Sequence, residues 1–304
     1  LGFQAVLDSD APREVRLHTT VSDRLDHGTD HPLAQGANTL DWTITVERPE
    51  LWWPHALGPA NLHDVAVAVH LAADEAAQLD TDTLSDTRQV RTGLRTVELD
   101  NWVWRVNGER LFLKGSNLPP TRYELGYATP AQLARDVELA VGTGLDFLRI
   151  HAHVTRPELY AAADEAGLLL WQDMPLQWGY ARSVRKQAVR QAREAVDLLG
   201  HHPSIALWCG HNEPMTIEDT ELRGSILRKA ALGAKVAAQQ QLPTWNKTVL
   251  DRSLKRSLEG ADSTRPVIAH SGAVPHPPRF DGTDAHLYFG WYWGEERNFP
   301  NFLR

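Results

Sequence analysis

The chain is poor in the residues that mark several classes of protein. It contains a single cysteine, Cys209, among 304 residues, which excludes an internal disulfide and a metal cluster held by several cysteines. Its 39 acidic residues outnumber 31 basic ones, and no run of like charge stands out. Because a phosphate backbone attracts basic patches, we expect no nucleic-acid partner. No stretch approaches the roughly 20 apolar residues of a membrane span, so we expect no membrane partner either.

Several short signatures are also missing. The sequence holds neither a Gly-x-Ser-x-Gly elbow nor a glycine-rich phosphate loop followed by Lys-Ser/Thr, and we expect no cofactor. The chain begins with Leu1, and no charged-then-apolar signal segment follows it. This favours a cytoplasmic location but leaves the compartment open, and the sequence is equally silent on oligomeric state.

What the chain does contain is enough apolar material for a folded core. Hydrophobic residues make up 42% and charged residues 23% of the sequence, which argues against disorder. Its length corresponds to two domains on the usual prior of roughly 150 residues each. The chain also has 11 tryptophans but only 7 phenylalanines and 2 methionines. Tryptophan can stack on sugar rings, although packing in a core is its commoner role.

Residues 1–98 have the alternating pattern of half-buried antiparallel strands. Leu40, Trp42 and Ile44 alternate with polar neighbours, and apolar residues recur at every second position from Val65 to Leu71. A later strand is expected over residues 90–99. Together these patterns predict an immunoglobulin-like β-sandwich that could lack strands on its N-terminal side.

Residues 99–304 alternate between strands and helices. Asn107-Gly108 favours a type I′ hairpin turn, and capping boxes at 129–132 and 155–158 predict two helix starts. Buried strands that alternate with helices predict a parallel sheet. The expected strands cover 111–117, 147–150, 168–171, 204–208, 266–270 and 284–289. A (β/α)8 TIM barrel needs eight strands, so we expect an incomplete barrel, truncated before strands 7 and 8.

The most specific string is HHPSIALWCGHNEP at positions 201–214. It reads as a buried strand that ends in a polar cluster. Barrel active sites lie at the carboxyl ends of the strands, so Asn212 and Glu213 are candidate site residues. A glutamate in a tryptophan-rich barrel mouth can stay protonated and donate that proton to a leaving oxygen. An isolated Asn-Glu pair would more simply be a solvated loop, but this long context favours catalysis.

This string resembles the glycoside hydrolase family 2 enzymes, which include β-mannosidases, β-galactosidases, β-glucuronidases and exo-β-glucosaminidases. Further strings carry the same resemblance: LWWP at 51–54, GLR at 93–95, VNGERLFLKG at 106–115, LRIH at 148–151, ADEAG at 163–167 and LLWQD at 169–173. The resemblance implies a jelly-roll domain, an immunoglobulin-like sandwich and a barrel, of which the first is absent here.

The resemblance also implies roles for individual residues. Glu213 matches the general acid/base, and Asn212 matches the asparagine that bonds the sugar 2-hydroxyl. Arg149 matches an arginine that supports the nucleophile. His286 and Tyr288 alternate along the sixth expected strand, so both can face the sugar. The substrate would be a terminal β-linked carbohydrate.

The nucleophile has no match in the sequence. Retaining members use a second carboxylate about 5–5.5 Å from the first, and the resemblance puts it on strand seven. Glu295 and Glu296 are the only late candidates, and they read as surface charges in a loop. We therefore expect this chain to be an inactive fragment of a retaining exo-β-glycosidase.

Other polar and aromatic residues complete the expected substrate site. Those at strand ends or in loops are Asn117, His151, Trp171, Asp173, Trp178, Trp291 and Trp293. For Asn117, a simple turn role is about as good an explanation. The Trp-Gln-Asp and Cys-Gly-x-Asn-Glu motifs favour the β-mannosidase branch, whereas the His151-Ala-His153 segment departs from it and leaves the sugar open.

Three alternatives remain at this point. The chain could belong to a β-galactosidase or β-glucuronidase of the same family. His151 and His153, with His286 and Asp284, could instead bind zinc in a metal-dependent barrel hydrolase, although most histidine pairs are structural. Finally, the chain could be a non-catalytic sugar-binding or structural piece, which would show weak sugar binding without turnover.

Overall fold

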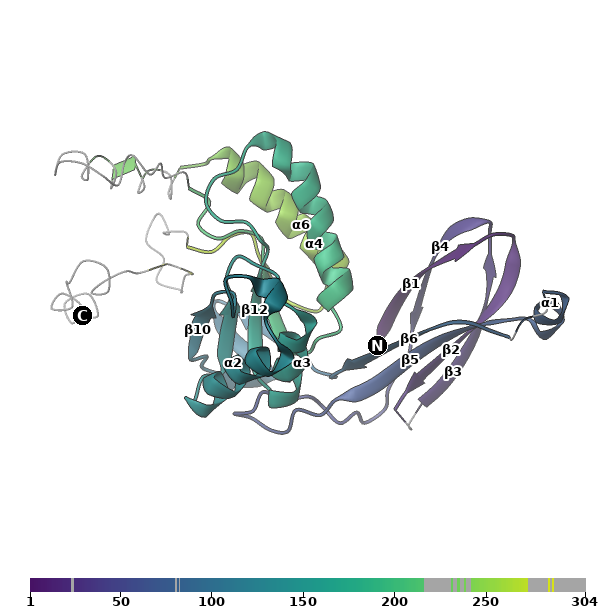
Figure 1. Ribbon diagram of the computed structural model, residues 1–304. Helices are drawn as coiled ribbons and strands as arrows, with labels where there is room; N and C mark the ends of the chain where they lie inside the picture. Colours follow the sequence, from purple (N-terminus) through teal and green to yellow (C-terminus); the bar gives the residue numbers. More distant parts are fainter. Residues whose placement is uncertain are drawn as a thin grey trace. The chain divides into compact units, whose positions relative to one another are not determined.

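Figure 1 shows the computed structural model of the chain, which describes residues 1–22, 25–79, 81, 83–215, 231, 234–235, 238, 242–272, 284 and 286. The chain forms two compact units. The first comprises Leu1–Arg95, Asp164–Gly167 and His201–Ser204, and the second comprises Thr96–Ala163, Leu168–Gly200 and Ile205–Arg304. Among the described residues, no helix is long and apolar enough to cross a membrane.

The first unit is a β-sandwich, as the alternating pattern predicts. One antiparallel sheet has the order β3 (Leu25–Leu33), β2 (Arg13–Val21), β5 (His63–Leu71) and β6 (Leu84–Thr92). The other pairs β1 (Gly2–Ser9) with β4 (Gly36–Thr43). The apolar positions of both sheets form the core, whose buried members are Val15, Leu17, Leu33 and Val69, with Leu7, Leu40, Trp42 and Leu71 packed against them. The short helix α1 (Ala73–Gln78) precedes β6.

The strand expected over residues 90–99 is two strands. β6 ends at Thr92, and β7 (Val97–Asp100) belongs to the second unit. Gly93 lies between them against the fully buried Trp52, and a Cβ atom on Gly93 would approach the Trp52 Cβ to 2.6 Å. This close backbone approach is available only to glycine, and it marks where the sandwich pattern stops. In this part of the chain the first compact unit ends at Arg95, and the domain boundary expected at residue 98 stays a prediction.

A hairpin leads into the second unit. β7 pairs with β8 (Val103–Val106), and β8 pairs with β9 (Glu109–Leu111). Asn107 and Gly108 have φ values of 51° and 81°, as a type I′ turn requires at both central positions. β9 stops at Leu111, and a separate strand begins after it.

The second unit is built on a parallel sheet. Its strands follow chain order: β10 (Gly115–Leu118), β11 (Phe147–Ile150), β12 (Leu169–Asp173), β13 (Ile205–Cys209) and β14 (Val267–Ile268). Every residue of β11, β12 and β13 is buried, in agreement with their continuous apolar character. The described residues thus contain five of the six expected strands, while the sixth, at 284–289, lies outside them except for 284 and 286. The barrel itself stays a prediction.

Helices connect these strands. They are α2 (Pro130–Gly142), α3 (Pro157–Ala166), α4 (Arg185–Leu199) and α6 (Asp251–Ala261), with short turns η1 (Leu125–Tyr127), η2 (Arg182–Val184) and the π-helical η4 (Asn246–Leu250). The predicted capping box of Thr129 and Gln132 is present. The one predicted at 155–158 is wrong, because Pro157 is the first helical residue and the buried Thr155 hydroxyl has no hydrogen-bond partner. α4 and α6 lie side by side (Figure 1), where Ser257 Oγ donates to Val189 O over 3.2 Å.

Candidate active site

The carboxyl ends of β11 and β12 are joined by a buried ion pair. Arg149 and Asp173 expose 8% and 0% of their side chains, and Arg149 Nη2 lies 2.8 Å from Asp173 Oδ2. Arg149 Nε donates to the same carboxylate at 3.0 and 3.2 Å. Burial alone would lower the pKa of Arg149, but the charge and hydrogen bonds of Asp173 outweigh it and raise this pKa. The guanidinium is therefore a fixed cation.

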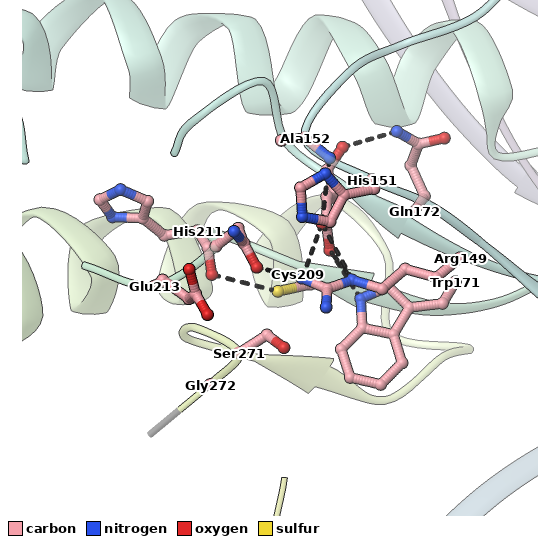
Figure 2. Close-up of polar contacts among 12 residues, drawn as sticks. Arg149, His151, Ala152, Trp171, Gln172, Cys209, His211, Glu213, Ser271 and Gly272 are labelled. Carbon is pink, nitrogen blue, oxygen red and sulfur yellow. Dashed lines mark hydrogen bonds and ion pairs between the residues drawn. The ribbon is translucent and has the colours of Figure 1, made fainter. Parts of the chain in front are cut away.

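Two further groups hold Asp173 in place. Trp171 Nε1 donates to Asp173 Oδ1 over 2.7 Å, and the backbone N of Ala152 donates to Asp173 Oδ2 over 3.1 Å. The Arg149 guanidinium carbon lies 4.9 Å from the centroid of a Trp171 ring, a cation–π distance. Figure 2 shows the side chains of Arg149 and Trp171 lying close together. Arg149 is thereby restricted to one orientation.

Asn212 extends this network to β13. It is 1% exposed, and its side-chain oxygen accepts from Arg149 Nη2 over 2.8 Å. Because a guanidinium can only donate, this contact assigns Oδ1 to the arginine side of the amide. The Asn212 Nδ2 hydrogens therefore point away from Arg149.

Glu213 follows directly and has an unusual backbone. Its φ is 47°, in the left-handed region that costs a non-glycine residue about 1–3 kcal/mol. Hydrogen bonds hold that conformation, since Glu213 N donates to Ser271 O over 3.0 Å and Met215 N donates to Glu213 O over 2.6 Å. The side chain is 12% exposed, so its carboxylate is largely enclosed.

The Glu213 carboxylate is paired with an imidazole. His286 Nδ1 lies 2.7 Å from Glu213 Oε1, and His286 Nε2 lies 3.2 Å from Arg149 Nη1 and 2.8 Å from Ser271 Oγ. Nε2 faces an obligate donor, so it accepts, and the proton is assigned to Nδ1, which donates to Glu213. His286 thus links the fixed cation of Arg149 to the carboxylate of Glu213.

A second acidic group lies beside the same residues. Gly272 N donates to Asp284 Oδ2 over 3.3 Å. Burial raises the pKa of Asp284, while a hydrogen bond from Ser271 and the nearby His286 and Arg149 limit that rise. The sequence pattern indicates Asp284 only as a possible metal ligand, and no motif indicates a role for Ser271 or Gly272.

Behind the Asn212–Glu213 loop, one buried carboxylate meets two histidines. Asp251 Oδ1, at the start of α6, lies 2.7 Å from His211 Nδ1, and both side chains are fully buried. His270 Nδ1 lies 3.1 Å from Asp251 Oδ2, without the geometry of a hydrogen bond. Because His211 precedes Asn212 and His270 precedes Ser271, Asp251 anchors both segments that carry the site. No local sequence pattern predicts this contact, whose partners are 40 residues apart.

The remaining predicted site residues fall into three groups. His151 is half-buried, and burial together with the charge of Arg149 lowers its pKa. Asn117 pairs in register with Arg149, but it is exposed. Trp178 is 48% exposed in the segment after β12. Tyr288, Trp291, Trp293, Glu295 and Glu296 lie outside the described residues.

The zinc alternative finds no support. His153 Nδ1 lies 3.0 Å from the His151 backbone oxygen, which occupies one of its two ring nitrogens. Within the part of the chain that the structure describes, no group of three histidine, cysteine, aspartate or glutamate residues could hold a metal ion. Cys209 is fully buried, and burial raises the pKa of its thiol well above its usual value.

Comparison with known proteins points to one group of enzymes. No family model matches the chain. It is 30% identical to β-mannosidase A of Emericella nidulans over 197 residues, which cover 56% of this chain and 20% of that protein. The β-D-mannosidase from Dictyoglomus thermophilum matches its structure with a TM-score of 0.75 and 21% identity, over 96% of this chain and 35% of that one. A Bacteroides uniformis β-glucuronidase matches with a TM-score of 0.74 and 22% sequence identity, over 99% of this chain and 36% of that one.

These matches confirm the resemblance to glycoside hydrolase family 2 and to its β-mannosidase members. The structural neighbours share the fold, a β-sandwich followed by an α/β unit. The chain spans about a fifth of the curated β-mannosidase that it matches, at 20% of its length.

Proposed function

We propose, from this kinship with family 2, that the chain is part of a retaining exo-β-glycosidase of the β-mannosidase type, with Glu213 as its general acid/base. One observation carries the proposal. Glu213 lies in the segment that follows the buried strand β13, and its Oε1 lies 2.7 Å from His286 Nδ1 within a cluster of buried polar groups. A solvated loop glutamate would have no such restraint, so the geometry favours a chemical role.

The reaction gives Glu213 two tasks. It first protonates the glycosidic oxygen as the sugar leaves, and it later removes a proton from the water that releases the sugar from the enzyme. His286 Nδ1 occupies Oε1, which directs the proton to the other oxygen, Oε2. In this tautomer His286 Nε2 accepts from Arg149 Nη1 over 3.2 Å, so Nδ1 carries the hydrogen that faces Glu213.

Asn212 and the Arg149–Asp173 pair serve the sugar. Arg149 can only donate hydrogen bonds, and its Nη2 donates to Asn212 Oδ1 over 2.8 Å. The Asn212 Nδ2 group is therefore turned away from Arg149 and can donate to the sugar 2-hydroxyl. Hydrogen bonds to this hydroxyl strengthen in the transition state of glycosidases. We also assign His151, Trp171 and Tyr288 to the walls of the sugar site, and Trp291 to stacking.

A retaining mechanism needs a second carboxylate about 5–5.5 Å from the first. We propose that this nucleophile lies outside the described residues, in the larger protein. The supporting fact is the length of the relatives, of which this chain matches only 20% in the β-mannosidase A comparison.

The experiment is a substrate panel on the full-length protein. Aryl β-mannoside, β-galactoside and β-glucuronide are supplied in turn, and proton NMR identifies the first-formed anomer of the released sugar. We expect hydrolysis of the mannoside, with the β-anomer appearing first. Preference for the galactoside or glucuronide would move the protein to those branches. An α-anomer first would reject retention, and binding without any hydrolysis would favour a sugar-binding protein.

A further inference from the structure

A second polar site lies on the helical side of the second unit. The segment around η2 and the helices α4 and α6 surround a hollow of about 700 Å³. Five cationic side chains line it together with one tryptophan: Arg182, Arg185, Lys186, Arg193, Arg256 and Trp245. The volume is within the ~300–1,000 Å³ typical of sites for small ligands.

Among the described residues, none of these five cations forms an ion pair with an acidic side chain. Two other basic residues on the same helices do have acidic partners: Arg190 pairs with Glu194 at 3.5 Å, and Lys255 pairs with Glu259. The whole chain carries a net charge of −8, so a local group of five unpaired cations runs against its composition. Their mutual repulsion would be relieved by an anion in the hollow.

The placement of the cations is directed toward the hollow. Lys186, Val189 and Arg193 are spaced three and four residues apart, so they share one face of α4. Arg256 and Ser257 face the hollow from α6. Arg185 and Lys186 also stand in the first turn of α4, where positive charge opposes the helix dipole and costs stability. A ligand with negative charge would compensate this cost.

We propose that this basic hollow binds an anionic carbohydrate, a sugar of about disaccharide size that carries sulfate or carboxylate groups. Guanidinium groups match sulfate and carboxylate oxygens with two parallel hydrogen bonds. Trp245, which is half-buried at the edge of η4, offers a flat apolar surface for a sugar ring. None of these six residues takes part in the described polar contacts around Glu213, so this is a separate site.

Binding of defined probes to the 304-residue chain tests the proposal without any need for turnover. Calorimetric titrations use a sulfated disaccharide, the unsulfated disaccharide, inorganic sulfate and ATP. We expect the sulfated disaccharide to bind, with an affinity that falls as salt rises, and the neutral sugar not to bind. Equal or tighter binding of ATP would assign the site to nucleotides. Equal binding of inorganic sulfate would show a simple anion sink. Either result overturns the proposal.

Matched variants then locate the site. Arg193→Gln should weaken binding of the sulfated disaccharide roughly tenfold, because it removes a charged hydrogen-bond donor. Arg190→Gln, three residues earlier on the same helix, makes the same change of charge outside the hollow and should leave the affinity unaltered. Trp245→Ala should weaken the sulfated disaccharide but leave inorganic sulfate unchanged. Equal effects of Arg193→Gln and Arg190→Gln would contradict the assignment.

Discussion

At the scale of single residues, Gly272 shows how closely the site is packed. Its φ is +81°, and an added Cβ would lie 2.8 Å from both Glu213 Cγ and His286 Nδ1. Gly272→Ala should therefore destabilise the chain by about 1–3 kcal/mol in urea unfolding and disturb the Glu213–His286 contact. Gly260→Ala is the control, since nothing lies within 4 Å of its added Cβ and its helix favours alanine. Equal free energies of unfolding for both variants would contradict this account.

Asp173 is the second residue whose loss the structure makes costly. Asp173→Asn keeps the shape but leaves the buried Arg149 without its counter-charge. We expect a loss of about 3–5 kcal/mol in the free energy of unfolding. Glu194→Gln removes one partner of the exposed Arg190–Glu194 pair, whose side chains are 65% and 59% exposed, and should change stability by at most about 0.5 kcal/mol. A loss below 1 kcal/mol for Asp173→Asn would show that water or another anion reaches Arg149.

At the scale of elements, Asp262 ties the end of α6 to β13. Its Oδ2 accepts from Trp208 Nε1 over 2.8 Å and from Arg265 Nη1 over 2.5 Å. Burial alone would raise the pKa of Asp262, but Arg265 and the bonds from Thr264 and Trp208 lower it from 3.8 to about 2. Because the pKa of Asp262 is lower in the folded than in the unfolded chain, the ionised carboxylate stabilises the fold at pH values above about 4. This stabilisation is lost as the pH falls from about 4 to about 2.

The matching variant is Asp262→Asn, which imitates the protonated acid. Near pH 6 it should unfold about 2 kcal/mol more easily than the original chain, and the difference should shrink as pH falls toward 2. Urea unfolding at several pH values measures it. A difference that is the same at pH 3 and pH 6 would show that the ionised carboxylate is not the stabilising form.

Turns, helix caps and strand ends are the elements that the sequence alone could predict. The Asn107-Gly108 turn and the Thr129 capping box follow from neighbouring residues, and both are present. Strand ends are equally readable and indicate Asp173 and Asn212 as site residues, whereas Arg149 is indicated by the resemblance to family 2. By contrast, the break at Gly93 depends on its contact with Trp52, and the anchoring of His211 depends on Asp251, which is 40 residues away in the sequence. No local pattern encodes such contacts.

At the scale of the whole molecule, the chain covers 35% of the Dictyoglomus thermophilum β-D-mannosidase. Its described part provides only one of the two carboxylates that the proposed mechanism needs, Glu213. We therefore expect the 304-residue chain alone to release no aryl alcohol from an aryl β-mannoside above the uncatalysed rate. The full-length protein, assayed in parallel, is the positive control. Measurable turnover by the short chain would mean that the nucleophile lies within it.

The proton donated by Glu213 is tested most directly by the dependence of rate on the leaving group. In the full-length protein, Glu213→Gln should lower kcat/KM by about 10²–10⁴-fold for β-glycosides with poor leaving groups, which need that proton. Substrates whose leaving group departs without protonation should lose far less. Full activity of Glu213→Gln on the poor leaving groups, measured beside the unaltered protein, would contradict the assignment of the acid.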